Sequence, residues 1–566
     1  MSSTLPITER PNDLIGQLLS EQQSMSAVER FSARHEAGDL ETETIPAQAR
    51  YYRDLLPASP PGPGQQFAFE VNLDTCSGCK ACVVACHTLN GLEEDETWRR
   101  VGTLTIGESS SDPLPVIQHV TTACHHCEDP GCLNGCPVKA YDKDPITGIV
   151  RHLDDQCIGC KYCTMMCPYE VPQYSDRLGI VRKCDMCHQR LSAGEAPACV
   201  QACPNQAIAI SVVDQDTAFS AESRLAPGAP LSTITKPSTR YTTSREHAVH
   251  AAMPQDTGID HVAESHWPLA VMLVATQASV GAIAVERSIA LIGFTGGLGT
   301  SIDLMRWTTL VALLIGGVGL NVAPLHLGKP LRAWRVFLGL RTSWLSREAI
   351  VLGKYMGLLS VAVGLAWLPA FADYLPDALV SMIPVWAADV TLTIALLTGL
   401  IGLFSSGMIY VATRRRLWRM ERTMARFFGS AVVLGFTTVA IVSTALDYQV
   451  IAIATGVLGA ASMAIKLAWE CKILLGRTPS SLGDNEDHRS QRLVQRELGQ
   501  WASLRLTMGG VGAVCLMLGS VSSPASMSLG LALIGTSLVA HLGGELMERL
   551  LYFSSVVYDR MPGTFR

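Results

Sequence analysis

The sequence predicts a chain of two unlike parts, an N-terminal α+β region and a C-terminal all-α bundle that crosses a membrane. Sixteen of the 18 cysteines in the 566-residue chain lie between Cys76 and Cys203, whereas long apolar segments begin only near Trp267. Hydrophobic residues make up 48% of the chain, charged residues make up 17%, and the net charge is −6. This balance excludes a mainly disordered chain and gives no support to nucleic-acid binding.

Residues 1–66 are expected to form an N-terminal extension that is partly disordered. They end in the stretch Pro57–Gly64, whose prolines and glycines are typical of a linker. The first residues show neither the basic start and apolar core of an export signal nor a twin-arginine pair. We therefore expect no export, and we expect a mobile tail, with docking of a partner as the alternative.

Residues 67–210 contain four cysteine motifs, two of them spaced C-x2-C-x2-C-x3-C. That spacing is typical of iron–sulfur proteins, because cysteines of one tight loop can reach one cluster. Zinc sites usually pair two C-x-x-C knuckles across a longer gap, and disulfides need an oxidising compartment, so both alternatives are disfavoured. The motifs supply four thiolates for each of four 4Fe–4S clusters. They comprise Cys76, Cys79, Cys82 and Cys86; Cys124, Cys127, Cys132 and Cys136; Cys157, Cys160, Cys163 and Cys167; and Cys184, Cys187, Cys199 and Cys203.

The four motifs are expected to exchange ligands. In two-cluster ferredoxins the last cysteine of each motif binds the other cluster, which predicts two ferredoxin-like units, one from the middle motifs and one from the outer motifs. Four clusters in series form a path for electrons, called the wire below. This path has no substrate pocket of its own and needs an electron donor and an acceptor. The predicted sets are Cys124, Cys127, Cys132 with Cys167; Cys157, Cys160, Cys163 with Cys136; Cys76, Cys79, Cys82 with Cys203; and Cys184, Cys187, Cys199 with Cys86.

Residues 263–566 are expected to form a bundle of eight transmembrane helices, connected to the cysteine-rich region by a linker over residues 211–262. Each apolar segment is close to the roughly 20 residues that cross the hydrocarbon core of a bilayer. The number of segments and their few charges argue against core helices of a soluble protein. The segments are 267–285, 307–325, 349–370, 385–410, 427–446, 449–470, 504–521 and 527–551.

Basic residues predict the orientation of the bundle. Three loops on one side contain seventeen Lys and Arg residues, whereas the loops on the other side contain Arg287 and Arg306. The positive-inside rule then places both termini and the iron–sulfur region in the cytoplasm of a bacterium, with the helices in its inner membrane.

From about Phe67 onward the sequence resembles dimethyl sulfoxide reductase and its relatives. The cysteine motifs resemble the four-cluster electron-transfer subunit, and the membrane half resembles the anchor subunit. Those subunits are usually separate polypeptides, so the fusion and the N-terminal extension are departures. The anchor resemblance depends on His266–Pro268, Leu325–Ala333, Leu345–Glu348, Gly544–Leu546 and Arg549.

The resemblance implies a site for menaquinol or ubiquinol on the basic side. It implies a role for His326 and Glu348, with Arg332 as a nearby fixed cation, and Glu545 and Arg549 are further candidates. For these last two a buried ion pair is the alternative, and for His326 the alternative is a role at a helix end. Lys354, Lys466 and Glu470 are expected as helix-end residues or packing partners. No paired histidines suggest haem, so none is expected.

The resemblance also implies the function: quinol is oxidised in the membrane and electrons pass through the clusters to a separate molybdenum bis-pterin catalytic subunit. That subunit would reduce dimethyl sulfoxide, another S- or N-oxide, nitrate, or an oxyanion of selenium or arsenic. The protein itself is not expected to perform the terminal reaction. One alternative reverses the current, with formate, hydrogen or a sulfur compound as donor and quinone as acceptor. The other is a transporter with an iron–sulfur regulatory domain, which predicts helices broken at the membrane midplane.

Overall fold

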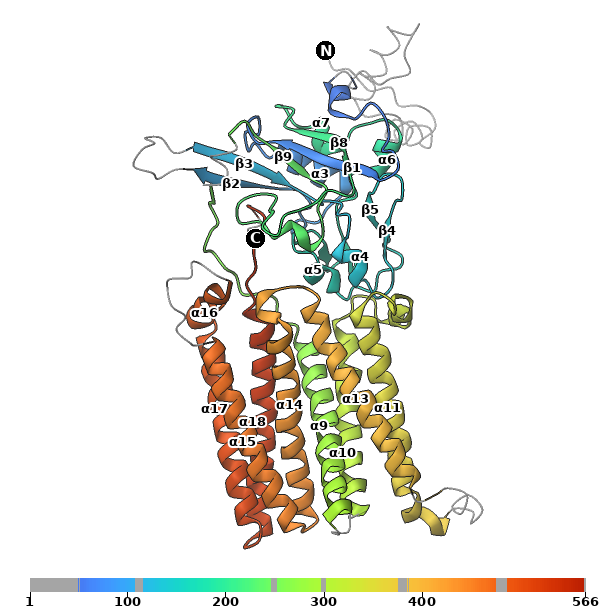
Figure 1. The fold of residues 1–566 in the computed structure, drawn as a ribbon, viewed down its shortest axis with the longest axis vertical. Helices are drawn as coiled ribbons and strands as arrows, with labels where there is room; N and C mark the ends of the chain where they lie inside the picture. Colours follow the sequence, from blue (N-terminus) through green and yellow to red (C-terminus); the bar gives the residue numbers. More distant parts are fainter. Residues whose placement is uncertain are drawn as a thin grey trace, which may run out of the picture.

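The computed structural model describes residues 49, 51–106, 116–245, 252–296, 302–374, 384, 386–474 and 486–563. A small α+β domain lies on one end of a long helical bundle (Figure 1), so the two predicted classes are confirmed. Most of the expected N-terminal extension falls outside the described residues. From its end, Ala49 and Tyr52 are buried against the α+β domain beside the turn η2 (Arg53–Leu55).

The α+β domain contains two three-stranded sheets and two hairpins. The first sheet has the order β8-β1-β9, with β1 (Gln65–Asn72) antiparallel to β8 (Ile208–Asp214) and parallel to β9 (Arg240–Thr242). The second has the order β10-β2-β3, all antiparallel. Its strands are β10 (Met253–Pro254), β2 (Arg100–Ile106) and β3 (Val116–Thr122). The hairpins pair β4 (Tyr141–Lys143) with β5 (Val150–His152), and β6 (Gln173–Ser175) with β7 (Ile180–Arg182).

Short helices follow the cysteine loops. The helices α4 and α5 pack against each other and face the bundle, whereas α3, α6 and α7 lie toward the far end of the domain (Figure 1). This arrangement of small sheets and short helices is a ferredoxin-like α+β fold. The helices are α3 (Ala81–Asn90), α4 (Gly131–Gly135), α5 (Tyr162–Met166), α6 (His188–Ser192) and α7 (Ala198–Gln201).

The segment expected as a linker, residues 211–262, packs on the α+β domain over its described part. It contributes the end of β8, the turn η3 (Ser232–Ile234) and the edge strands β9 and β10. The side chain of Ser238 also donates a hydrogen bond of 2.7 Å to the carbonyl of His125 in the second cysteine motif. The polar composition of this segment therefore supplies sheet edges and turns.

Among the described residues, eight helices are long and apolar enough to cross a membrane. They match the eight predicted segments, and most are longer at one or both ends. They are α9 (Trp267–Gly296), α10 (Ile302–Val322), α11 (Trp344–Trp367), α13 (Ala387–Val411), α14 (Met420–Ala445), α15 (Gln449–Leu474), α17 (Gly499–Ser522) and α18 (Met527–Ser554).

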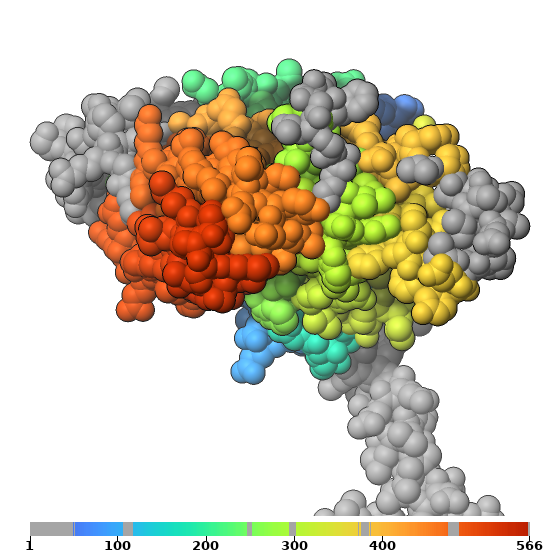
Figure 2. Space-filling model, turned by 90° about the horizontal axis from the view of Figure 1, so that it is seen from below, coloured from blue at the N-terminus to red at the C-terminus, as the bar shows by residue number. Residues whose placement is uncertain are grey.

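The helices α9 and α14 form the centre of the bundle. In their most apolar windows 83% and 72% of the residues are buried. They approach closely because a Cβ atom on Gly281 would lie 1.9 Å from the carbonyl oxygen of Ala431, and one on Gly435 would lie 2.4 Å from Gly281. Such close crossing at small residues is typical of membrane helices. Seen from the end away from the α+β domain, the first four helices lie on one side and α15, α17 and α18 on the other (Figure 2).

Shorter elements complete the end of the bundle that meets the α+β domain. They are η4 (Ala323–His326), η5 (Pro330–Gly339), η7 (Arg416–Trp418) and α16 (Glu486–Arg496), while η6 (Leu368–Tyr374) follows α11 at the other end. After α18 the polypeptide rises into the α+β domain (Figure 1), where Met561 is buried and Arg560 donates its N–H to the carbonyl of Gly228 at 3.1 Å. The last described residues therefore tie the two parts together.

Candidate functional site

The cysteine motifs lie on tight loops that lead into short helices. Gly78 and Gly159 turn two of these loops with φ of 71° and 68°, and Lys80 and Lys161 follow with φ of 61° and 57°. Non-glycine residues rarely adopt such left-handed conformations, so these loops are strongly shaped. The sixteen motif thiols are buried or half-buried apart from Cys79, which is exposed.

Backbone amides donate hydrogen bonds to several motif sulfurs. The N–H groups of Ala140 and Ala207 donate to the sulfurs of Cys136 and Cys203, each at 3.2 Å. The N–H of Gly159 donates to Cys157 at 3.4 Å. Amide donors stabilise thiolates and the sulfurs of iron–sulfur clusters, and their number tunes the reduction potential.

The last cysteine of each motif lies near thiols of a different motif. The thiols that act electrostatically on Cys163 are those of Cys160, Cys136 and Cys157, so a second-motif cysteine stands among third-motif cysteines. In the same way Cys167 acts on Cys132 together with Cys124 and Cys127.

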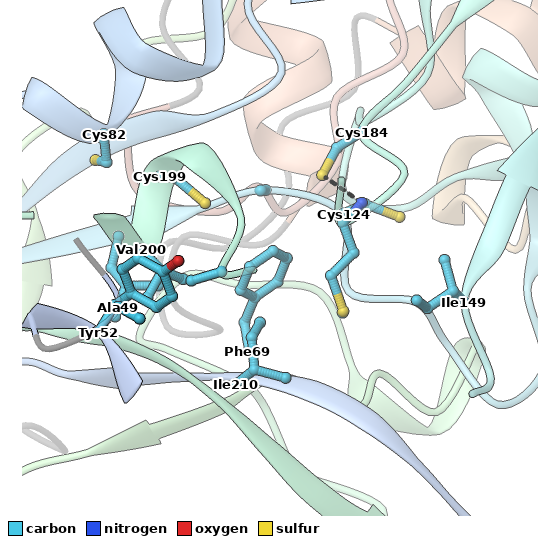
Figure 3. Close-up of a cluster of buried hydrophobic side chains, with 14 residues drawn as sticks. Ala49, Tyr52, Phe69, Cys82, Cys124, Ile149, Cys184, Cys199, Val200 and Ile210 are labelled. Carbon is cyan, nitrogen blue, oxygen red and sulfur yellow. Dashed lines mark hydrogen bonds between the residues drawn. The ribbon is translucent and has the colours of Figure 1, made fainter. Parts of the chain in front are cut away.

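The outer motifs show the same exchange. Cys203 acts on Cys76 beside Cys82 and Cys79, and Cys199 and Cys187 act on Cys86. Figure 3 shows thiols from all but the third motif around the hydrophobic core that buries them.

The residues present fit iron–sulfur clusters better than single metal ions. A cavity is lined by all four of Cys124, Cys127, Cys132 and Cys167, together with Lys183 and Tyr169. Among the described residues, no three His, Cys, Asp or Glu side chains converge closely enough to hold one ion, whereas a zinc ion draws its sulfur ligands to about 2.3 Å. Burial raises the pKa of the Cys86 thiol to about 12 and that of Cys167 to about 11, so ligation is needed to ionise them at neutral pH.

The third-motif loop lies directly on the bundle. The N–H of Lys329 donates to the carbonyl of Ile158 at 3.0 Å, and the Tyr162 hydroxyl donates to the carbonyl of Ile409 in α13 at 3.0 Å. At the end of the second motif, the hydroxyls of Ser343 and Ser346 donate to the carbonyls of Gly135 and Pro137 at 2.7 and 3.2 Å. Cys136 and the Cys157–Cys163 loop are thus the thiol-bearing segments that meet the membrane half.

His326 and Glu348 are both near this contact. His326 is half-buried at the end of η4, where its Nδ1 contacts the carbonyl of Ala323, and His266 and Lys161 lie close enough to act on its charge. Glu348 is buried in the first turns of α11, with Tyr162 and Tyr410 as electrostatic neighbours. Within the described part of the protein its Oε1 atom has no hydrogen-bond partner.

Arg332 contacts the cysteine-rich domain. Its guanidinium donates to the carbonyls of Cys157 and Asp154 at 3.3 and 3.5 Å. Arg335, one turn further, donates to the carbonyl of Asp155 at 2.6 Å. These two arginines therefore position the loop that carries Cys157.

Glu545 belongs to a buried ionic network. It contacts Lys466, accepts a hydrogen bond from Arg505 at 2.9 Å and accepts another from Ser430 at 2.5 Å. Glu470 pairs with Arg505 at 3.0 Å and with Lys466 at 3.5 Å. All four charged residues are at most 5% exposed. Of the two roles expected for Lys466 and Glu470, the structure supports packing partners, because each is held inside the bundle by opposite charge, whereas Lys354 is exposed.

Arg549 extends the same network. It pairs with Glu548 at 3.2 Å and donates to Gln277 and Ser430 at 3.0 and 2.9 Å. The structure thus brings Glu545 and Arg549 together through Ser430, each with its own ionic partner. These contacts favour the structural alternative, and a role of either residue in quinol binding stays a prediction.

Two aromatic residues at the contact were not anticipated from the sequence. Tyr162 is buried and has Cys160 and Glu348 as electrostatic neighbours. Tyr410 has Glu348 and Arg549 as neighbours and packs in a cluster of rings with Trp418 and Tyr552. In the sequence, the only local sign of a special role for Tyr162 is its place directly before the third cysteine of its motif. Its position against α13 depends on how the two parts pack.

Cysteine motifs on ferredoxin-like loops, joined to eight spanning helices, define an iron–sulfur electron-transfer protein with its own membrane anchor. Residues 116–213 match the family model of the 4Fe-4S dicluster domain, and residues 261–555 match that of the DMSO reductase anchor subunit (DmsC). The chain belongs to the DMSO reductase anchor subunit family and carries the iron–sulfur part in the same polypeptide. The recognised resemblance is therefore confirmed.

Relatives of the N-terminal part include subunits of several reductases. A subunit of the anaerobic dimethyl sulfoxide reductase of Haemophilus influenzae is 34% identical over 180 residues, which cover 31% of this protein and 87% of that subunit. The corresponding subunit of the Escherichia coli enzyme is 37% identical over 155 residues, covering 26% and 75%. The thiosulfate reductase electron transfer subunit PhsB of Salmonella typhi is 38% identical over 141 residues, covering 25% and 72%.

Proposed function

We propose that this protein oxidises quinol where its two parts meet and passes the electrons through four 4Fe–4S clusters to a separate molybdenum bis-pterin reductase. The observation that carries the proposal is the buried Glu348, whose Oε1 atom has no partner among the described residues and which lies beside Tyr162 of the third-motif loop. A buried carboxyl group is a suitable proton acceptor for a quinol hydroxyl.

The ligand sets that we propose follow the exchange of last cysteines. Their support is the set of thiol neighbours, which groups Cys136 with the third motif and Cys167 with the second. The outer sets combine Cys203 with the first motif and Cys86 with the fourth. When bound, such clusters each accept and donate one electron.

The residues around the proposed quinol site would act on its two hydroxyl groups. Oxidation of a quinol releases two electrons and two protons. Glu348 would accept one proton, and His326 would bind the other oxygen and accept the second proton, with His266 beside it. The two electrons would pass one at a time to the cluster that meets the bundle. Arg332 would hold the Cys157 loop in place, and buried Tyr162 would keep water out of the space between quinol and thiols.

We propose a path for the electrons from the two ends of the series of clusters. Cys136 and the Cys157–Cys163 loop meet the bundle, whereas α3, which carries Cys82 and Cys86, lies at the far end of the domain (Figure 1). Cys79 is exposed there. We place the catalytic reductase at this far end, and the relatives that are named as reductase subunits support a reductase as the partner. The arginine-rich loops contact the iron–sulfur domain, which favours a cytoplasmic location in the bacterial inner membrane.

The test is reduction of the clusters by a quinol analogue under anaerobic conditions. We expect Glu348→Gln to slow this reduction by about 100-fold or more, as loss of a proton acceptor does, and His326→Ala to slow it as well. Dithionite should reduce both variants fully, which shows intact clusters. Lys354→Gln, an exposed charge on the same helix α11, is the matched control and should behave like wild type.

Normal rates in both variants would exclude this quinol site. The same preparation distinguishes the reversed current, with formate, hydrogen or a sulfur compound as donor. Clusters that quinone oxidises but quinol fails to reduce would favour that alternative.

The backbones of the two parts approach closely at Gly328, and this contact predicts the effect of a larger side chain there. A Cβ atom on Gly328 would lie 2.0 Å from the carbonyl oxygen of Gly179, and one on Gly159 would lie 2.9 Å from the Gly328 nitrogen. Gly328→Ala should therefore separate the third-motif loop from the bundle and slow quinol-driven reduction by about tenfold or more, since small displacements strongly reduce rates. Iron content should not change.

The control for this substitution is Gly317→Ala in α10, where the nearest atom to a new Cβ is 4.0 Å away. Its reduction rate should equal that of wild type. Equal rates for Gly328→Ala and wild type would show that this contact is not needed for electron transfer.

A further inference from the structure

Lys183 is a buried cation among thiols. Its side chain is only 3% exposed, although lysine is almost never fully buried without a partner of opposite charge. The ammonium group donates to the sulfur of Cys124 at 3.5 Å and to the carbonyl of Cys184 at 2.9 Å, and it also contacts the carbonyl of Val150. It therefore lies between the second and the fourth cysteine motifs.

Arg99 is a second buried cation in the same domain and is 2% exposed. Its guanidinium lies 4.5 Å from the centre of the Phe69 ring and donates to the hydroxyl of Thr121 at 3.2 Å. That hydroxyl is in turn 3.6 Å from the sulfur of Cys82. The Nη2 atom has no hydrogen-bond partner among the described residues.

Neither cation has a carboxylate partner within the part of the sequence that the structure describes. The nearby Glu96 pairs instead with Arg182. Burying an unpaired charge costs several kcal/mol, so a compensating negative charge is required. The thiols supply it. The ammonium group of Lys183 lies 3.5 Å from the sulfur of Cys124, and the thiols of Cys132 and Cys184 are its further electrostatic neighbours.

The same balance holds for Arg99. Four thiols are electrostatic neighbours of its guanidinium, those of Cys199, Cys82, Cys184 and Cys86. Cys184 is thus a neighbour of both cations. In the set of Cys136, Cys157, Cys160 and Cys163, the cationic neighbour is His152, which acts on Cys157.

We propose that Lys183 and Arg99 are fixed cations between successive clusters and that they raise the reduction potential of the clusters beside them. The inference rests on the ligand sets proposed above. With those sets, Lys183 separates the cluster of Cys124, Cys127, Cys132 and Cys167 from the cluster of Cys86, Cys184, Cys187 and Cys199. Arg99 separates the latter from the cluster of Cys76, Cys79, Cys82 and Cys203.

The physical reason is charge. Each transfer along the wire moves one electron, so that one cluster is oxidised as its neighbour is reduced, and no atom or proton needs to move. A reduced cluster carries one more negative charge, and an adjacent buried cation stabilises that form more than the oxidised form. At the cluster that meets the membrane, the cationic neighbour of a ligand thiol is a histidine, His152 beside Cys157, in place of a buried lysine or arginine.

The experiment compares Lys183→Met with Lys183→Arg in the full-length protein, with iron content and redox titration followed by electron paramagnetic resonance. Lys183→Met should lower the midpoint potential of at least one cluster by about 59 mV or more, which is a tenfold change in its one-electron equilibrium. Lys183→Arg should retain most of the wild-type potential. Arg99→Met and Arg99→Lys form an independent pair with the same expectation.

Unchanged potentials in Lys183→Met and Arg99→Met, at full iron content, would overturn the inference while leaving the four clusters in place. Loss of iron in Lys183→Met that Lys183→Arg restores would support a requirement for charge. Loss of iron in both Lys183→Met and Lys183→Arg would show that Lys183 matters only for packing, and it would overturn the proposed electrostatic role. Fewer than four clusters in the wild-type protein would contradict the proposed function itself, so the two failures are distinguishable.

Discussion

Replacing Cys136 by alanine is expected to remove the cluster of Cys157, Cys160 and Cys163, although Cys136 belongs to the preceding motif. Its thiol lies among the third-motif thiols, and the N–H of Ala140 donates to its sulfur at 3.2 Å. The next residue, Pro137, accepts a hydrogen bond from Ser346 of the bundle. Quinol-driven reduction of the remaining clusters should fall to background, because the lost cluster is the one that meets the membrane.

Paired substitutions measure which thiols share a cluster. Electron paramagnetic resonance of dithionite-reduced protein should show one cluster missing in Cys136→Ala combined with Cys163→Ala. Two clusters should be missing when Cys136→Ala is combined with Cys132→Ala, because these thiols belong to different clusters and their losses add, whereas losses within one cluster do not. Two missing in the first pair and one in the second would contradict the exchange of ligands. Cys515→Ala, a cysteine in α17 outside the motifs, should leave all the clusters intact.

Replacing Glu545 by alanine is expected to destabilise the membrane half by about 3–5 kcal/mol, since removing one partner of a buried pair leaves unpaired charge. Glu545 is fully buried and contacts both Lys466 and Arg505. Glu470 can compensate only part of that loss because it already pairs with both cations. Unfolding in detergent micelles, followed by helix signal against denaturant, measures the change in free energy.

Two controls separate charge from packing. Lys354→Met removes an exposed charge from α11 and should change stability by no more than about 0.5 kcal/mol. Glu545→Gln combined with Lys466→Met removes opposite charges together and should recover much of the loss, because neutral replacements of buried pairs are often tolerated. A Glu545→Ala protein as stable as wild type would show that the network contributes little to stability.

Much of the fold could be predicted because the signals are local. The spacing of Cys157, Cys160, Cys163 and Cys167 marks an iron–sulfur loop without reference to any other segment, and a run of about 20 apolar residues identifies a spanning helix by length alone. The helices α9 and α14 were predicted like the others. Their central position was not, because it depends on Gly281 and Gly435 meeting across two helices.

The features of the candidate site also fall into those that local sequence predicts and those that depend on tertiary structure. The sequence by itself determined that the protein holds iron–sulfur clusters, that it spans a membrane and that basic loops lie on one side, since each property follows from residue type and spacing. Only the tertiary structure decided that Arg332 binds the Cys157 loop, that Lys466 and Glu470 are buried, and that Lys183 and Arg99 lie between motifs. The physical reason is that the role of a charged side chain depends on the groups around it. Those groups come from segments distant in the sequence.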